Sequence, residues 1–268
     1  NTRGGAMTHR ILLVVPTLGK RHDLLEACLR SIRSQSMPAE VVIVSPPNPA
    51  IRAFADSVSA QWVEDPKEGL AAAINAGVRS AQGRFDYLSW LGDDDLLTAD
   101  SLAHTSHALD ESPTAILAYG PCIYIDAVGT NLWINSAQPW VVPVLAWGPQ
   151  LVPQPGMLVR STTWNEVGGL DESYSMAFDF DLLLRLKKRG HFVRVDQPVS
   201  CFRWHADSLT VDDRTHNLRE SERAKRAALS PSLRRIAWLW EPPVRWATRL
   251  AASRVQARAR RAATGNAS

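Results

Sequence analysis

The chain has 268 residues, of which 45% are hydrophobic and 21% charged, a globular composition that suits one sizeable domain with an appendage. A formal net charge of only +3 argues against a nucleic-acid binder. The charge is uneven, because residues 231–268 carry eight arginines against the single acid Glu241, so the remainder of the chain is net negative.

The first residues of the sequence do not resemble a signal peptide. The apolar run at residues 11–15 ends at Pro16, and no stretch reaches the roughly 18 apolar residues needed to cross a bilayer. The three cysteines, Cys28, Cys122 and Cys201, form no C-x-x-C pair, which favours reduced thiols. We therefore expect a cytoplasmic protein, at the inner face of the membrane if the basic tail binds lipid.

The first half predicts alternating strands and helices. Strands are expected at 11–15, 40–45, 61–64 and 85–91, and helices at 23–34, 50–60 and 69–81. This rhythm is typical of right-handed βαβ units, so the expected fold class is α/β, with a mostly parallel central sheet flanked by helices. Ligands bind beyond the carboxyl ends of such strands. Three segments fall at these ends: Pro16-Thr17, Ser45-Pro46 and Asp93-Asp94-Asp95.

The second half is less regular. We expect one or two strands over 115–125, an irregular tryptophan-rich segment over 133–155, strands at 157–160, 192–195 and 199–204, and helices over 179–189 and 212–229. These patterns predict a domain over residues 8–230, with two halves at 8–97 and 98–230. A basic amphipathic helical tail is expected over 231–268.

The acidic triplet Asp93-Asp94-Asp95 carries the clearest chemical signal. Consecutive carboxylates are tolerated in a solvated turn or at a helix N-terminus, and that is the structural alternative. Here the triplet directly follows a predicted buried strand, where a ligand would lie. Carboxylate oxygens suit Mg²⁺ or Mn²⁺, which in turn bridge phosphates, so the context favours a metal–phosphate site.

Several short motifs follow one another over roughly residues 10 to 210. They are Val14-Val-Pro-Thr17, Val41-Val-Ile-Val44, Asp65-Pro-Lys-Glu-Gly-Leu70, Ala73-Ile-Asn-Ala-Gly77, Leu91-Gly-Asp-Asp-Asp95, Gly168-Gly-Leu-Asp-Glu172 and Asp179-Phe-Asp-Leu182. Each motif alone is weak evidence. In this order and spacing the chain resembles an inverting glycosyltransferase of family 2, with the A-type nucleotide-diphospho-sugar transferase fold.

The resemblance implies that residues 8–97 form a nucleotide-binding half, with a donor site for a UDP, dTDP or GDP sugar, and that residues 98–230 form an acceptor-binding half. Asp94 would hold Mn²⁺ or Mg²⁺, with Asp95 in support and His205 as a further ligand, and Asp93 would contact the ribose side. The remaining donor contacts that we expect are Pro16, Thr17, Ser45, Asp65, Gly69, Asn75 and Arg203.

Two departures from the family pattern affect this donor site. Gly92 stands where the first acid of the usual D-x-D motif falls. Ser45-Pro46-Pro47 replaces the paired aspartates that help to hold the base. The base is therefore not determined by the sequence, and Asp65 is expected to take part of its contact.

The resemblance also implies a catalytic base. Inversion needs one carboxylate to remove the acceptor hydroxyl proton, and Asp179 matches that position. Phe178 stands where a Glu often precedes this Asp. Asp181 competes with Asp179 for the role of base, and it is otherwise expected to contact the acceptor or to be structural. The alternative for either aspartate is a helix N-cap.

The acceptor is expected to be a hydroxyl compound in cell-wall, polysaccharide or glycolipid assembly. Gln154 and Trp140 are the other expected acceptor contacts, although Trp140 and its neighbouring tryptophans equally suit packing under a loop. The tail interleaves arginine with tryptophan and leucine, which suits a membrane surface and hence a lipid-linked acceptor. The alternative for the tail is a helix packed on the domain or on a partner.

Two other functions compete with a glycosyltransferase. A sugar nucleotidyltransferase would need a glycine-rich basic loop after the first strand, of which Leu18-Gly-Lys-Arg21 is a faint version. A non-catalytic nucleotide-sugar-binding subunit of a glycan-assembly complex is compatible with the departure at Ser45-Pro46-Pro47. No nucleic-acid partner is expected, and the sequence does not indicate an oligomeric state.

Overall fold

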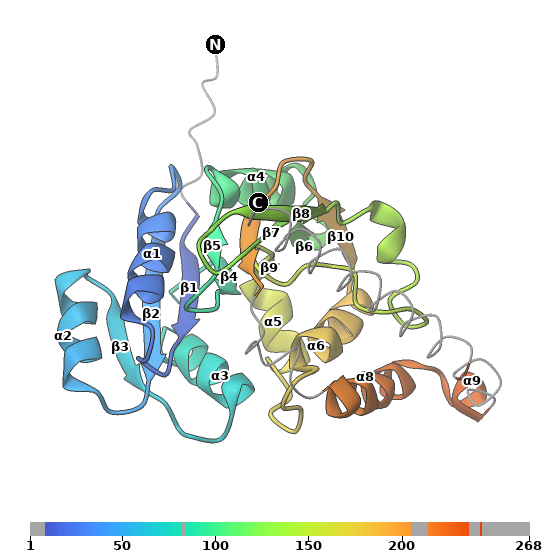
Figure 1. The fold of residues 1–268 in the computed structure, drawn as a ribbon. Coiled ribbons are helices and arrows are strands. Elements are labelled where there is room, and N and C mark those ends of the chain that lie inside the picture. Colours follow the sequence, from blue (N-terminus) through green and yellow to red (C-terminus); the bar gives the residue numbers. More distant parts are fainter. Residues whose placement is uncertain (1–8, 82–83, 205–213, 236–241, 243–268) are drawn as a thin grey trace, which may run out of the picture.

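A seven-stranded sheet forms the centre of the molecule in a computed structural model that describes residues 9–81, 84–204, 214–235 and 242 (Figure 1). The strand order is β10-β6-β9-β4-β1-β2-β3, and only β9 runs antiparallel to its neighbours. The strands are β1 (Ile11–Pro16), β2 (Ala39–Ser45), β3 (Gln61–Glu64), β4 (Tyr87–Trp90), β6 (Ala115–Tyr119), β9 (Leu158–Arg160) and β10 (His191–Arg194). The expected fold class, a mostly parallel α/β sheet, is confirmed.

Helices cover both faces of this sheet because the central strands are apolar on both sides. In β1, Ile11, Leu13 and Val15 face one core, whereas Leu12 and Val14 face the other. The first core contains α1 (His22–Arg33), α2 (Pro49–Ser57) and α4 (Ser101–Glu111). The second contains α3 (Leu70–Ser80), α5 (Ser161–Val167) and α6 (Phe178–Lys187), with α8 (Arg214–Ala228) packed against α6.

A second, four-stranded sheet lies beside the first. Its order is β5-β11-β7-β8, from β5 (Leu96–Leu97), β11 (Ser200–Arg203), β7 (Cys122–Ile125) and β8 (Asn131–Asn135). The segment expected to hold one or two strands over 115–125 therefore forms two, in different sheets. The chain changes sheet at Gly120, where a Cβ would come within 2.7 Å of the Val195 side chain.

Two sequence expectations are corrected here. The residues after Asp95 form β5, so Asp95 does not cap a helix. The segment expected to be irregular from 133 begins inside β8 and continues, after the short helical turn η1 (Pro139–Val141), mainly as turns.

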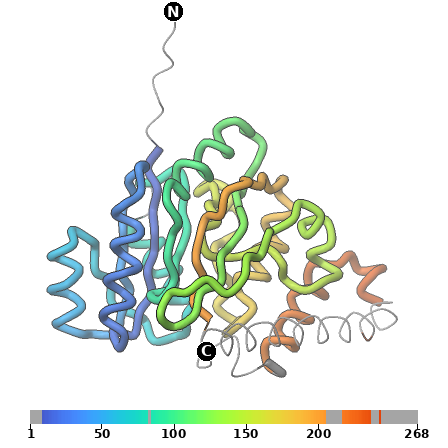
Figure 2. The backbone as a smooth tube through the Cα atoms, turned by 45° about the horizontal axis from the view of Figure 1, so that its top comes forward, coloured from blue at the N-terminus to red at the C-terminus, as the bar shows by residue number. Residues whose placement is uncertain are grey.

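The carboxyl ends of β1, β2 and β4 meet at one edge of the large sheet. The Thr17 amide donates to the Val44 carbonyl at 2.9 Å, and the Leu91 amide donates to the Val14 carbonyl at 3.0 Å. In Figure 2 these strands lie in the part of the chain coloured blue to teal. The part coloured green to orange, which is the expected acceptor-binding half, lies beside them. The sheet edge thus places the acidic triplet next to the loop after β1.

Beyond Ser230, the structure describes α9 (Pro231–Arg235) and residue 242 of the expected tail. The boundary at residue 230 therefore stays a prediction. In the described ranges, no helix is both long and apolar enough to cross a membrane.

Candidate functional site

Asp93 is hydrogen-bonded to Thr17, which directly follows the neighbouring strand β1. The Thr17 hydroxyl donates to Asp93 Oδ2 at 2.6 Å, and Thr17 Oγ1 itself accepts the Gly19 amide at 3.0 Å. Asp93 is buried, and burial raises the pKa of its carboxyl, while the bonds from Thr17 and Arg21 oppose that rise. The loop after β1 and the triplet after β4 therefore form one site, as the sequence predicted.

Arg21 joins the same site and was not predicted as a site residue. It precedes α1, and its guanidinium donates from Nη2 to Asp93 Oδ1 at 2.6 Å and from Nη1 to Asp94 Oδ2 at 2.7 Å. Two carboxylates from consecutive residues thus converge on one cation. The sequence signal was the Leu18-Gly-Lys-Arg21 segment, which was weighed only as a nucleotidyltransferase loop.

Asp95 turns away from Arg21 into the protein. Its Oδ1 accepts the backbone amide of Arg203 at 2.9 Å, and burial raises the pKa of Asp95 well above its usual range. A Cβ on Gly92 would come within 3.1 Å of carboxylate oxygens of both Asp94 and Asp95. A side chain at position 92 would thus crowd the triplet, so Gly92 suits this packing.

Arg203 is buried and bonds backbone carbonyls. Its guanidinium donates to the carbonyls of Asp94, Asp126 and Ala127 at 3.1, 2.9 and 2.9 Å. This arrangement differs from the diphosphate contact expected of Arg203 and from the metal support expected of Asp95. The two residues instead fasten β11 to the triplet, because the Asp95 carboxylate accepts the Arg203 amide and the Arg203 guanidinium donates to the Asp94 carbonyl.

Ser45 and Asp65 lie together at the ends of β2 and β3. The Ser45 hydroxyl donates to the Pro46 carbonyl and accepts the Trp62 indole N–H, both at 2.9 Å. The Asp65 amide donates to the Ser45 carbonyl at 2.8 Å, and the Asp65 carboxylate accepts the Lys67 amide at 2.8 Å. Asp65 is therefore the acidic side chain that flanks the position where the paired aspartates are missing.

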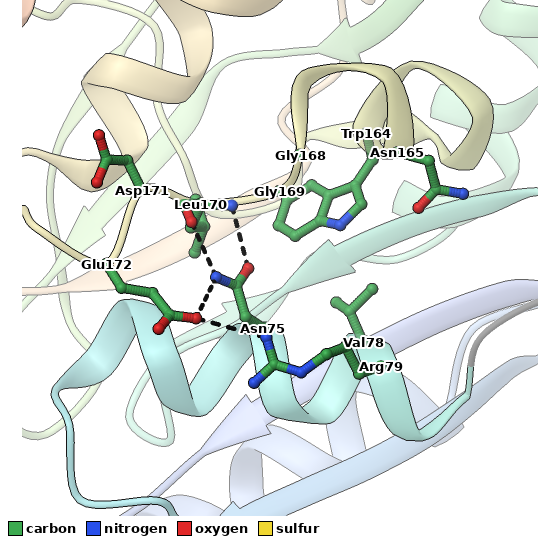
Figure 3. Close-up of a pocket in the computed structure, with 10 residues that line it drawn as sticks. All are labelled: Asn75, Val78, Arg79, Trp164, Asn165, Gly168, Gly169, Leu170, Asp171 and Glu172. Atoms are coloured by element: carbon green, nitrogen blue, oxygen red, sulfur yellow. Dashed lines mark hydrogen bonds and ion pairs between the residues drawn. The ribbon is translucent and has the colours of Figure 1, made fainter.

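Asn75 lies in α3 at a pocket of about 470 Å³ between α3 and the loop after α5 (Figure 3). Its Nδ2 donates to the Leu170 carbonyl and to Glu172 Oε1, both at 2.8 Å, and its Oδ1 accepts the Leu170 amide at 3.0 Å. Both ends of the Asn75 amide are thus used to fix the Gly168–Glu172 loop. This structural use differs from the contact with the nucleotide sugar that the sequence led us to expect of Asn75.

Gly69 precedes α3 with a backbone φ of +104°, which strains residues that carry a Cβ. A Cβ there would meet nothing within 4 Å, so conformation and not space favours glycine. Gly69 is exposed at the start of a helix that begins on the carboxyl side of β3.

Asp179 lies in the first turn of α6. Its Oδ2 accepts the Gln150 amide N–H at 2.8 Å, and its Oδ1 accepts the Phe180 amide at 2.7 Å. Burial raises the pKa of Asp179, and the Gln150 bond opposes the rise. The N-cap residue of α6 is Ala177, so neither Asp179 nor Asp181 occupies the N-cap position.

Asp181 is paired inside the protein. Its Oδ2 accepts Arg185 Nε at 2.7 Å, and Arg185 Nη1 donates to the Val167 and Gly169 carbonyls, both at 2.8 Å. The pair ties α6 to the end of α5. This pairing agrees with the structural alternative for Asp181 and differs from the acceptor contact expected of it.

The other acceptor candidates are spread along the chain after β8. The Gln154 amide donates to the Trp90 carbonyl at 2.9 Å, which places Gln154 at the end of β4, close to the triplet. Trp140 is 60% exposed, whereas Trp133 stacks on Tyr124 with ring centroids 4.4 Å apart. His205 lies outside the described residues.

No group of three or more His, Cys, Asp or Glu side chains that could hold a metal ion occurs within the described residues. The donor set still fits a divalent cation, because Asp93 and Asp94 already direct carboxylate oxygens at a single positive group. Further ligands would come from the substrate phosphates and from water, as is usual for Mg²⁺ and Mn²⁺.

The sequence pattern described as Glycosyl transferase family 2 matches residues 12–153, which include the loop after β1 and the acidic triplet. The chain belongs to glycosyl transferase family 2. Asp93, Asp94 and their Thr17 and Arg21 partners lie within the matched part, whereas Asp179 lies beyond it.

Two known proteins resemble the chain in sequence. The O-antigen biosynthesis protein RfbC of Myxococcus xanthus is 29% identical over 192 residues, which cover 66% of this chain and 14% of RfbC. A glycosyltransferase described as uncharacterized, from Haemophilus influenzae, is 21% identical over 219 residues, covering 78% of this chain and 73% of that protein. The chain thus spans a small part of the first relative and most of the second.

Solved glycosyltransferase structures share the fold. A fragment of S. aureus TarS, residues 1–349, in a complex with UDP-GlcNAc gives a TM-score of 0.63 at 12% identity, over 84% of this chain and 69% of that fragment. The mannosyltransferase PcManGT of Pyrobaculum calidifontis, in a complex with GDP-Man and Mn²⁺, gives 0.58 at 17% identity, over 97% and 88% of the two chains. The expected A-type glycosyltransferase fold is confirmed.

Proposed function

We propose that this family 2 glycosyltransferase transfers a sugar, with inversion and with a divalent cation, from a nucleoside-diphosphate sugar to a hydroxyl acceptor. The observation that carries the proposal is the convergence of Asp93 and Asp94 on one cation at the carboxyl end of β4. The complexes of TarS with UDP-GlcNAc and of PcManGT with GDP-Man and Mn²⁺ support it by fold analogy.

In the proposed donor site, Asp94 holds Mn²⁺ or Mg²⁺, with His205 as a further ligand. The bound ion would neutralise the charge of the departing diphosphate. Asp93 contacts the ribose, because each carboxylate oxygen has two lone pairs and the bonds from Thr17 and Arg21 leave acceptor capacity. Asp65 contacts the base, and the backbone of Pro16, Thr17, Ser45 and Gly69 borders the site. Asn75 and Arg203 are not part of it.

Asp179 is the proposed general base. It takes the proton of the acceptor hydroxyl as that oxygen attacks the anomeric carbon, and the bond to the diphosphate breaks with the electron pair leaving on the diphosphate. The Gln150 amide orients the carboxylate by its 2.8 Å bond. A base with a raised pKa is a stronger proton acceptor, provided that it is ionised at the working pH.

The proposed acceptor binds between Gln154 and the turn segment at residues 139–148. Val141 and Leu145 of this segment are buried, whereas Trp140, Val144 and Trp147 are partly exposed at helical spacing on its other side. Indole faces stack on sugar rings. A lipid-linked acceptor, presented at the cytoplasmic face of a membrane to which the basic tail binds, agrees with the role of RfbC in O-antigen biosynthesis.

A ligand screen by thermal unfolding tests the proposed donor site. A ligand that binds only the folded state raises the unfolding midpoint by mass action. We expect one nucleotide among UDP, GDP and dTDP, or its sugar conjugate, to raise the midpoint in the presence of Mn²⁺. The Mn²⁺-dependent part of the rise is expected to be lost in Asp94→Asn.

The matched control is Asp56→Asn, an exposed carboxylate in α2 outside the site. It should respond to ligands as the unmodified chain does. No rise with any nucleotide at millimolar ligand and metal would contradict the proposed donor site. A Mn²⁺-dependent rise without turnover on any acceptor would favour a non-catalytic subunit instead.

A further inference from the structure

Arg21 occupies the place in the acidic site where a divalent cation is expected. Its two terminal nitrogens reach carboxylate oxygens of Asp93 and Asp94 at 2.6 and 2.7 Å. Two neighbouring carboxylates repel each other when no cation lies between them. The guanidinium removes this repulsion because its planar, forked donors match two acceptors at once.

We propose that Arg21 is a placeholder cation that holds Asp93 and Asp94 ready in the metal-free enzyme and gives up Asp94 when the metal binds. The inference rests on the proposed function, because it assigns the metal to Asp94. It goes further by naming a residue of the chain that competes with the metal for the same carboxylate. Arg21 is thus a positioning residue that sets the metal affinity of the donor-free enzyme.

The two bonds of Arg21 differ in how readily they can be replaced. Asp93 is also held by the Thr17 hydroxyl and is buried, so its position does not depend on Arg21 alone. The Arg21 side chain is 41% exposed and that of Asp94 is 16% exposed. Water therefore reaches the Arg21–Asp94 contact, and the guanidinium can withdraw toward solvent from the end of the loop.

A divalent ion and the guanidinium repel each other at Asp94, because both are positive. Binding of one must therefore weaken binding of the other, and the coupling is equal in both directions. Removal of Arg21 is expected to strengthen metal binding to the donor-free protein and to destabilise the metal-free fold. Without Arg21 the metal-free site would hold two neighbouring carboxylates at the end of β4 without the guanidinium charge between them.

Isothermal titration of Mn²⁺ into Arg21→Met, in the absence of nucleotide, tests the inference on the full chain. We expect the dissociation constant to fall by roughly tenfold, since a nearby unit charge interacts strongly at partly buried sites. The unfolding midpoint of the metal-free variant should lie below that of the unmodified chain. Saturating Mn²⁺ should raise the midpoint of the variant by more than it raises that of the unmodified chain. Arg21→Lys should be intermediate, because an ammonium cannot span both carboxylates as the guanidinium does.

The control is Lys20→Met, which removes an exposed positive charge from the same loop. In the part of the chain that the structure describes, the triplet forms its ion pairs from this loop with Arg21 and not with Lys20. Its Mn²⁺ dissociation constant should change by less than about threefold, as expected for screened surface charge. An unchanged or higher dissociation constant in folded Arg21→Met would overturn the placeholder role. Absence of Mn²⁺ binding by the unmodified chain would instead overturn the metal role of Asp94. The proposed competition between Arg21 and the metal would be overturned with it.

Discussion

Asp179 and Asp181 lie close together in the first turns of α6, and their surroundings differ. Asp179 meets a neutral amide, that of Gln150, whereas Asp181 forms an ion pair with Arg185 at 2.7 Å. Burial raises the pKa of both carboxyls, but only at Asp181 does a neighbouring positive charge oppose the rise. These environments favour proton transfer at Asp179 and a fixed charge at Asp181.

Asp179→Asn is expected to lower kcat by about 10²- to 10⁴-fold, because the amide cannot accept the hydroxyl proton. The unfolding midpoint and the nucleotide-induced rise should be kept, since the carbonyl oxygen of the substituted amide can still accept the bond from Gln150. Asp181→Asn should keep kcat and lower the free energy of unfolding by roughly 1 to 3 kcal/mol, because it leaves the partly buried Arg185 without its charged partner. Full activity in Asp179→Asn would assign the base elsewhere.

Gln150→Ala tests the pH dependence of the proposed base. The Gln150 bond lowers the pKa of Asp179, so its removal raises that pKa further. The base must be ionised, and activity is lost as the pH falls through its pKa. The acidic limb of the kcat profile is therefore expected to move to higher pH in Gln150→Ala, and to stay in place in Gln138→Ala, an exposed glutamine of the same segment. A shift toward lower pH would contradict the assignment.

The start of α6 is held by a second helix, α8. The Glu220 carboxylate accepts the backbone amides of Ser175, Met176 and Ala177 at 2.9, 2.7 and 3.0 Å. These amides belong to the three residues that directly precede α6, next to the helix end that carries partial positive charge. Burial opposes ionisation of Glu220, but the three donors outweigh it and lower its pKa to about 2. The helix that carries Asp179 is therefore anchored from α8.

Glu220→Gln is expected to lower the free energy of unfolding at pH 7 by roughly 1 to 3 kcal/mol, because a neutral amide accepts these bonds more weakly. The folded pKa is depressed from 4.5 to about 2, so the stabilisation is present above the unfolded pKa and is lost as the pH falls toward 2. Denaturation at several pH values should show the difference shrink over that window. Glu111→Gln, at an exposed helix end, should show little effect at any pH.

The charge of the whole molecule is divided along the chain. The described body contains both sheets and the acidic site, whereas the arginines of residues 231–268 lie mostly outside the described part. An arginine-rich and tryptophan-containing segment is suited to an anionic lipid surface. A body with net negative charge would by itself be repelled from such a surface, so the tail is the proposed membrane contact.

Replacement of Arg245, Arg249 and Arg258 by glutamine is expected to weaken binding to anionic vesicles by roughly 100-fold, since each basic residue contributes about 1 kcal/mol there. Cosedimentation with phosphatidylserine-containing vesicles measures the loss. Vesicles of phosphatidylcholine alone and the unmodified chain are the controls. Equal sedimentation of the two proteins with anionic vesicles would indicate that the tail packs on the domain or on a partner.

Local sequence patterns were enough to predict most of the elements and the position of the acidic triplet. The expected strand at 61–64 agrees with β3, and the expected helix at 23–34 agrees closely with α1. Such features depend on the spacing of apolar residues over a few turns, which is local information. The alternation of strands and helices also predicted the parallel sheet, and with it the edge at which Thr17 and Asp93 meet.

The role of each polar side chain at that edge depends on tertiary packing. Arg21 donates to a carboxylate 72 residues away, and the Arg203 amide donates to the Asp95 carboxylate across 108 residues. Asn75 and Asp181 match family positions in sequence, yet their partners lie in the loop after α5 and in Arg185. Which donor meets which acceptor depends on strand register and on side-chain direction after packing. Local periodicity contains neither, because both arise only when distant segments are brought together.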